Sequence, residues 1–200
     1  MTDTKKGRTP GRPRNFDADQ AVAKAQGMFH ARGYDAVSVA DLTAALGIKP
    51  PSFYAAFGSK AGLYSRVLER YSESGAIPFA ALLRADRPVA VCLAEVLEEA
   101  ARRYGASADA PGCLVVEGTR SNDPDAQAAA CVHHDAAEAL IHDYIAARFP
   151  EGADRITDFM DTVMAGLSAM ARRGHGTERL MASAKMAGRA LMREFSEDHA

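Results

Sequence analysis

The sequence of 200 residues contains no tryptophan, only three cysteines and no run of eighteen or more apolar residues. The lack of a long apolar run predicts a chain that does not span a membrane. Its N-terminus is polar and basic and lacks the apolar segment of a secretion signal. An odd number of cysteines argues against a disulfide framework and for a reduced setting. We therefore expect a cytoplasmic protein without a membrane partner.

Common catalytic motifs are also missing. The sequence has no phosphate-binding glycine loop, no nucleophile elbow and no paired-cysteine zinc motif. We therefore expect a protein that is not an enzyme and that has no cofactor or resident metal.

The charged residues are unevenly distributed. Residues 1–70 carry a net charge of +5 and residues 71–200 a net charge of −7, which together give the net charge of −2. A basic segment attached to an acidic remainder is typical of a unit that faces phosphates and a body that stays away from them.

The basic segment contains a stretch, residues 38–60, that predicts two short helices joined by a tight turn. Ser38 and Asp41 have the spacing of a capping box, which starts the first helix. Gly47 ends that helix because glycine adopts a left-handed conformation without a side-chain clash. Pro50 fits the first turn of the next helix, where amides have no partner anyway. This pattern indicates a helix-turn-helix for binding duplex DNA.

The second of these helices has fewer than about ten residues and is too short to be stable in isolation. We expect a small apolar core to hold it, formed by Phe29, Tyr34, Val39, Leu42, Leu46, Ile48, Phe53 and Phe57.

The run GIKPPSFYAAFGSKAGLY, with the preceding FDADQAVAKAQGMFHARGYDAVSVADLTAAL, resembles the tetracycline-repressor (TetR) family of bacterial transcription regulators. The resemblance covers roughly residues 12–68, about a third of the chain. It implies an all-α homodimer, with an N-terminal three-helix helix-turn-helix DNA-binding domain and a larger C-terminal helical domain for ligand binding and dimerisation. It also implies a repressor that binds a palindromic DNA operator and is released by a small-molecule effector.

We expect three parts: a flexible basic arm (1–14), the DNA-binding domain (15–74) and the C-terminal domain (75–200). Gly75, Pro78 and Pro88 mark the second boundary because they interrupt the helical pattern. Further helices are predicted at about 89–104, from Pro111, and at about 123–149, 152–173 and 176–195.

The last two predicted helices carry apolar residues at three- and four-residue steps. Such a stripe is usually core, and the resemblance makes it partly a dimer interface, where each protomer contributes two helices to a four-helix bundle. We expect the small residues Ala184, Ala187 and Gly188 to allow close approach of the two protomers.

The predicted DNA contacts come from four places. Arg12 and Arg14 would reach phosphates or a minor groove, although a solvated basic tail is the alternative. Ser38 lies at a helix N-terminus, where a phosphate is favoured. Thr43 is either a contact to the DNA backbone or simply an exposed helical threonine. The complete set is Arg12, Arg14, Ser38, Thr43, Lys49, Pro50, Ser52, Tyr54 and Lys60.

Lys49, Pro50 and Ser52 open the second helix and should face base edges and adjacent phosphates. The resemblance adds the Tyr54 hydroxyl as a donor to one phosphate and Lys60 as the partner of another. The small Ala55 and its neighbours offer few hydrogen bonds to bases, so specificity should depend on DNA shape as well.

Possible sensor residues lie in the C-terminal part. His134, Glu138 and His142 recur at four-residue steps; adjacent members have metal-ligand spacing, but all three span about 12 Å of helix and should not share one ion. Cys113 is predicted at a helix N-terminus, where a thiolate is favoured, although a small buried cysteine is the alternative.

An apolar effector pocket is expected between residues 89 and 170, with Met160 and Met164 among its walls. The alternatives are a metal- or thiol-responsive regulator of the same fold and a small helical metalloenzyme.

Overall fold

The computed structural model describes residues 17–197, and all of the regular structure in that range is helical. The all-α prediction is confirmed. The predicted basic arm, with Arg12 and Arg14, lies outside the described residues. The helices are α1 (Ala18–Arg32), α2 (Val39–Leu46), α3 (Pro50–Phe57), α4 (Lys60–Ser74), α5 (Phe79–Leu82), α6 (Val89–Gly105), α7 (Leu114–Gly118), α8 (Pro124–Ala146), the short 3-10 turn η1 (Pro150–Gly152), α9 (Ala153–Arg172) and α10 (Thr177–Glu197).

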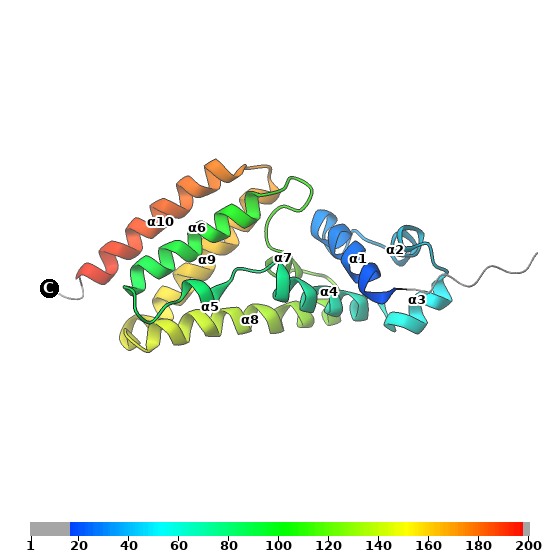
Figure 1. The fold of residues 1–200 in the computed structure, drawn as a ribbon, viewed down its shortest axis with the longest axis horizontal. Helices are drawn as coiled ribbons and strands as arrows, with labels where there is room; N and C mark the ends of the chain where they lie inside the picture. The colour runs from blue at the N-terminus through cyan, green and yellow to red at the C-terminus, as the bar shows by residue number, and fades with distance from the viewer. Residues whose placement is uncertain (1–16, 198–200) are drawn as a thin grey trace, which may run out of the picture.

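The molecule is elongated, with α1 to α3 at one end and the long helices α6, α8, α9 and α10 at the other (Figure 1). We call residues 17–58 the head and residues 75–197 the body. Helix α4 connects them and packs against α1 on one side and against α7 and α8 on the other. None of the helices within residues 17–197 is both long and apolar enough to cross a membrane.

The local signals in the head produce the expected geometry. The Ser38 hydroxyl accepts from the Asp41 amide at 3.0 Å, and the Asp41 carboxylate accepts from the Ser38 amide at 2.9 Å, which completes the capping box. Gly47 has φ 66° and ends α2. The rings of Phe53 and Phe57 lie 5.4 Å apart in the core beneath α3. Burial of these rings holds a helix of eight residues in place.

The helix predicted from Pro111 begins later, at Leu114. Gly112 has φ 76°, and its amide donates to the Tyr104 carbonyl at 3.0 Å, so the chain turns there instead of entering a helix. The Cys113 amide then donates to the Ser168 hydroxyl at 2.9 Å. Helix α5 and turn η1 were not predicted, because four and three residues leave no periodic pattern to detect.

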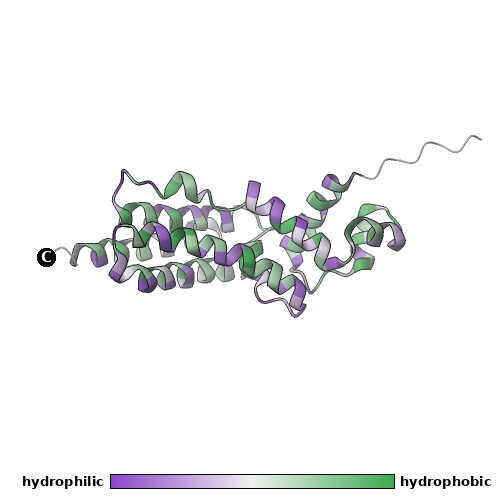
Figure 2. Ribbon diagram, turned by 90° about the horizontal axis from the view of Figure 1, so that it is seen from below, coloured by the Kyte–Doolittle hydropathy of each residue, from purple (hydrophilic) through white to green (hydrophobic). Residues whose placement is uncertain are grey.

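The small residues of α10 do not have the expected position. Ala184 is fully buried, and a methyl group added at Gly188 would lie 3.0 Å from the Ala94 side chain of α6. Helix α10 packs more extensively against α6 than against any other helix. The prediction that these residues bring two protomers together is therefore wrong for Ala184 and Gly188, because they bring α10 close to α6 within one chain. Figure 2 shows polar and apolar residues alternating along the body helices.

Candidate nucleic-acid interface and body cavity

The outer surface of α3 is almost entirely exposed. Lys49, Pro50 and Ser52 at its start are exposed, and Tyr54 has 51% of its surface accessible. Phe53 and Phe57 point the opposite way, into the core. The sequence of α3 therefore separates a packing side from a side that is open to a partner.

The N-terminus of α3 offers few backbone donors. Proline at the first two positions has no N–H group. The next two amides, of Ser52 and Phe53, both donate to the Lys49 carbonyl, at 3.0 and 3.1 Å. The side chains of Lys49, Ser52 and Tyr54 are consequently the polar groups that this helix presents.

The N-terminus of α2 is a better site for an anion. The capping box satisfies the amides of Ser38 and Asp41, and the intervening amides of Val39 and Ala40 are directed out of the helix end. The Asp41 carboxylate is paired with Arg32 at 3.4 Å, which offsets its negative charge beside a phosphate. The Ser38 hydroxyl and Ser38 amide lower the pKa of Asp41.

Thr43 does not lie on the outer surface. It is 6% exposed, and its hydroxyl donates to the carbonyls of Val39 at 2.9 Å and Ala40 at 3.1 Å. The prediction of an outward Thr43 is wrong, because a threonine in a helix satisfies its hydroxyl on the preceding turn and its methyl group packs inward.

Lys60 is used within the protein. Its ammonium donates to the carbonyls of Tyr34 at 3.1 Å and Val37 at 3.0 Å, and it lies 3.8 Å from the centre of the Tyr34 ring. Desolvation by burial lowers the pKa of Lys60, while Asp35 and Asp123 act in the opposite direction. Its first role is to fix the turn between α1 and α2.

Sequence reasoning missed Lys24, which donates its ammonium to the Ala45 carbonyl and so ties α1 to the end of α2. An exposed lysine in the middle of a helix carries no signal of such a contact, since the partner belongs to another helix.

Two polar contacts join the head to the start of α8. The Tyr34 hydroxyl donates to the Asp123 carboxylate at 2.7 Å, and Asp123 is also the N-cap of α8. The Asp35 carboxylate accepts from the Ser121 hydroxyl at 3.0 Å and from the backbone and side-chain nitrogens of Asn122 at 3.0 and 2.9 Å. The hydrogen bond from Tyr34 lowers the pKa of Asp123.

A third contact lies at the end of α1. His30 Nε2 is 3.0 Å from the Gly112 carbonyl, and Arg172 of α9 donates to the His30 carbonyl at 3.2 Å. Desolvation by burial lowers the pKa of His30; the hydrogen bond to Gly112 opposes this and Arg172 adds to it. We call the contacts made by His30, Tyr34 and Asp35 the seam.

A cavity of about 360 Å³ opens in the body, between α4, the segment from residue 76 to residue 80, α7, α8 and α9. Cys113 lies at one end, where the Tyr71 hydroxyl donates to its Sγ at 3.8 Å. Cys113 is the N-cap of α7, as expected, and is 9% exposed. Burial raises the pKa of the Tyr71 and Tyr104 hydroxyls beside it.

Met164 lines the cavity as predicted, whereas Met160 does not. Met160 is fully buried in the helical core. The two residues are one turn apart on α9, and the packing of α9 between its neighbours determines which of them reaches the cavity.

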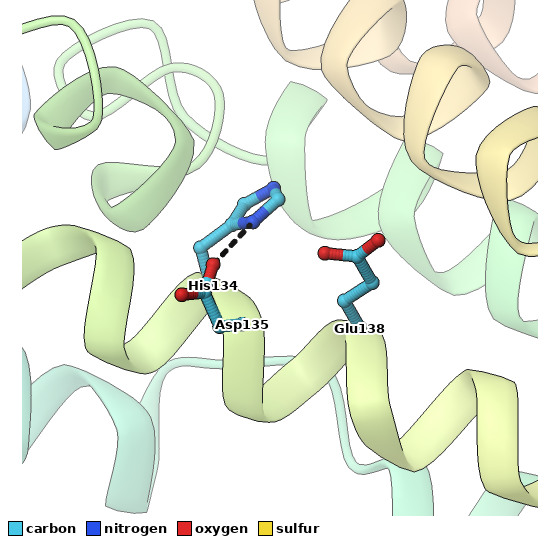
Figure 3. Close-up of side chains that lie close together, drawn as sticks. All are labelled: His134, Asp135 and Glu138. Atoms are coloured by element: carbon cyan, nitrogen blue, oxygen red, sulfur yellow. Dashed lines mark ion pairs between the residues drawn. The ribbon is translucent and has the colours of Figure 1, made fainter.

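The polar residues of α8 form a cluster that the sequence only partly indicated. His134, Asp135 and Glu138 each offer a ligand atom within 4.8 Å of the others, and His134 and Glu138 project from the same side of α8 (Figure 3). His134 also lies 2.9 Å from Asp161 of α9. His142 belongs elsewhere, with Asp154 at 3.1 Å, as the expected spacing implied.

The sequence profile of the bacterial regulatory proteins of the tetR family matches residues 22–67, which include α2 and α3. The HTH-type transcriptional repressor BdcR of Escherichia coli (strain K12) is 56% identical over 191 residues, or 96% of this chain and 97% of that protein. This chain belongs to the TetR family.

Two further comparisons agree with this assignment. The repressor ComR of the same organism is 31% identical over 182 residues, covering 86% of this chain and 87% of that protein. The solved structure of the TetR family regulator CifR, a cysteine mutant complexed with operator DNA of 26 base pairs, has a TM-score of 0.78 and 33% identity, covering 90% of this chain and 99% of that chain. The protein is a DNA-binding transcriptional repressor of the TetR family and not an enzyme.

Proposed function

We propose that this TetR family protein binds a roughly palindromic operator as a homodimer in the cytoplasm and leaves the operator when a small molecule enters the body cavity. The proposal divides the chain into a DNA-binding part, residues 15–74, and a part for ligand binding and dimerisation, residues 75–200. The observation that carries it is the exposed outer side of α3, which a buried core holds in a fixed orientation.

In this proposal α3 enters the major groove. Lys49 and Ser52 face base edges and flanking phosphates, and Tyr54 donates its hydroxyl to a phosphate. The end of α2, with Ser38 and the two amides after it, binds a second phosphate. Lys60 contributes by fixing the turn before α2, and its one remaining N–H is directed to the DNA backbone. Arg12 and Arg14 extend the contacts along the backbone.

Apolar side chains on the outer sides of α9 and α10 support a dimer. Phe159 of α9 is 36% exposed, and Met186 and Met192 of α10 are 66% and 38% exposed. Single exposed apolar residues need no explanation, but in this proposal a second copy of the chain covers these three residues on the adjacent helices α9 and α10. One short helix contacts few bases, so two copies about 34 to 36 Å apart are needed for successive major grooves.

Two helices connect the cavity with the head. Helix α4 carries Tyr71 at the cavity and Lys60 at the turn of the head. Helix α8 carries His134 and Glu138 at the cavity and Asp123 at the contact with Tyr34. A ligand that prefers a different placement of α4 or α8 would therefore move the head and weaken operator binding by its differential affinity.

The experiment that tests this proposal is selection of bound duplexes from a random DNA pool by the full-length protein, followed by salt titration of the selected sequence. We expect one palindrome, bound by two chains. Tyr54→Phe should weaken binding by about a hundredfold or more, because each of the two protomers loses a hydrogen bond to a charged group, worth about 1.5–3 kcal/mol. Lys49→Ala should reduce the salt slope by about two, one contact for each protomer.

Matched controls are Tyr144→Phe and Arg148→Ala, which remove a tyrosine hydroxyl and a positive charge from the far end of the body. Their operator affinity and salt slope should equal those of the wild type. Failure to enrich any sequence, or equal behaviour of head and body variants, would contradict the proposed DNA contacts.

A further inference from the structure

The lining of the body cavity is mainly apolar. Side chains from several helices and from residues 76–80 form its walls, among them Ile77, Phe79, Val116, Leu140 and Ile141. Its volume of about 360 Å³ is at the lower end of the range for small-molecule sites. The walls thus suit the hydrocarbon body of a small ligand.

The charged groups of the lining have one sign. Glu138 of α8 and Asp161 of α9 contribute carboxylates, and none of the described residues around the cavity is a lysine or an arginine. His134 binds Asp161 at 2.9 Å, and His133 binds the Ser72 hydroxyl at 3.0 Å. A ligand carboxylate here would lie beside like charges with no lysine or arginine to compensate it, whereas a ligand cation would be attracted by both carboxylates.

A buried hydroxyl at the same place has no partner. Thr157 lies one helical turn before Asp161 on α9, lines the cavity and is 3% exposed. Its Oγ1 makes no hydrogen bond within residues 17–197. Leaving such a group unsatisfied is costly, and a ligand that supplies a partner removes that cost. Thr157 is therefore a second polar feature of the cavity lining, besides the two carboxylates.

We propose that the cavity binds a small amphiphilic organic cation, with its apolar body among α5, α7 and α8 and its ammonium group at Glu138, Asp161 and Thr157. This proposal names the class of ligand that the body cavity binds. It rests on the proposed function in one respect, namely that ligand binding releases the protein from DNA.

A bare metal ion explains fewer of the observations. The cluster of His134, Asp135 and Glu138 would hold an ion on α8, but the Asp135 side chain is 75% exposed. An ion at that cluster would leave the apolar part of the cavity unfilled. An organic cation uses the carboxylates and the apolar walls together.

Three probes with one phenylbutyl body test the proposal: phenylbutylamine, phenylbutanol and phenylbutyrate. Their binding to the full-length protein is measured by titration calorimetry and thermal shift at pH 8, where histidine is mostly neutral. We expect the amine to bind at least about tenfold more tightly than the carboxylate, with the alcohol between them. An equal or stronger affinity for phenylbutyrate would overturn the proposal.

Two variants of α8 test whether Glu138 produces the preference for a cation. Glu138→Gln should weaken amine binding about tenfold and leave alcohol binding unchanged. Asp143→Asn makes the same change of charge on α8 at an exposed residue outside the cavity lining and should leave all three affinities unchanged. Equal effects of these two variants would show that Glu138 does not contact the ligand and would overturn the assignment.

Thr157→Val tests the hydroxyl separately. We expect weaker binding of both the amine and the alcohol without a lower melting temperature, because the hydroxyl has no partner to lose. Unchanged binding of the amine and the alcohol would show that the Thr157 hydroxyl does not contact the ligand.

Zinc alone is the last probe. If zinc binds tightly, Glu138→Gln abolishes this binding and none of the three organic probes binds, the proposal of an organic cation is overturned and a metal ion is the ligand. Operator binding is measured without probes on the same preparations. Loss of the amine preference with intact operator binding would refute the ligand class alone, whereas absence of operator binding would refute the proposed function.

Discussion

The head and the body differ in where their polar groups find partners. In the head the Ser38 hydroxyl binds an amide three residues away, and the Thr43 hydroxyl binds a carbonyl four residues away. In the body and the seam several partners are distant in sequence: 55 residues separate Cys113 from Ser168, and 89 separate Tyr34 from Asp123.

This difference has a functional consequence. Helices α2 and α3 of the head are held by local caps and a small core, so shifts between distant segments of the body should change their geometry little. A cavity and a seam made of contacts between distant segments change when those segments shift. We infer that regulation changes the position of the head relative to the body and leaves the geometry within the head unchanged. The three predictions below test this comparison of head and body.

The largest effect is expected inside the head, for two adjacent residues of α3. Phe53→Ala should lower the free energy of unfolding of the head by about 3–5 kcal/mol and abolish operator binding, because Phe53 is fully buried. Tyr54→Ala should change it by no more than about 0.5 kcal/mol yet still weaken operator binding. Hydrogen exchange of α1 to α3 and fluorescence anisotropy with operator DNA measure the two quantities. Similar losses of stability in both variants would contradict the separation of packing and DNA-binding sides.

An intermediate effect is expected on the outer surface of the body. Met186→Glu on α10 should convert the proposed dimer to monomers, because it places a charge in an interface that must exclude water. Val132→Glu on α8 is the control, since Val132 is similarly exposed, at 68% against 66%, and α8 lies on the opposite edge of the body from α10 (Figure 1). Analytical ultracentrifugation gives the masses. A dimer that survives Met186→Glu, or one that Val132→Glu disrupts, would refute the assigned interface.

The smallest effect is expected at the seam and depends on pH. Burial lowers the pKa of His30 below its usual 6.5, so the unfolded protein takes up a proton at a higher pH than the folded protein. The stability contributed by neutral His30 is therefore complete above about pH 6.5 and is lost as the pH falls from there toward the folded pKa. The protection factors of the amides at the end of α1, corrected for the intrinsic pH dependence of exchange, should fall as the pH is lowered from about 7.5 to about 5 in the wild type.

His30→Gln should flatten that dependence, because glutamine does not titrate. His142→Gln, at the far end of α8 and bound to Asp154, should leave it unchanged. An unaltered pH profile in His30→Gln would show that another group controls the seam.

Much of the fold was accessible from the sequence because its signals are local. Ser38, Asp41 and Gly47 define α2 through bonds within a single turn, and the apolar spacing of the long helices does not depend on their partners. The exposed positions of Lys49, Ser52 and Tyr54 follow from the same periodicity. Two predictions were wrong because another hydrogen bond forms. The Gly112 amide donates to the distant Tyr104 carbonyl, so α7 starts later than predicted, and the Thr43 hydroxyl donates to the Val39 carbonyl within its own helix, so Thr43 does not face outward.

The sequence by itself therefore determined the long helices, the caps of the head, the family and the side of α3 that faces outward, since each depends on residues within a few positions of one another. Only the tertiary structure decided that Lys60 binds the turn of the head, that Gly188 packs on α6, and that Glu138, Thr157 and Asp161 border one cavity. Those outcomes depend on the packing of whole helices, in which a rotation by about half a turn around the helix axis exchanges a buried side chain for an exposed one.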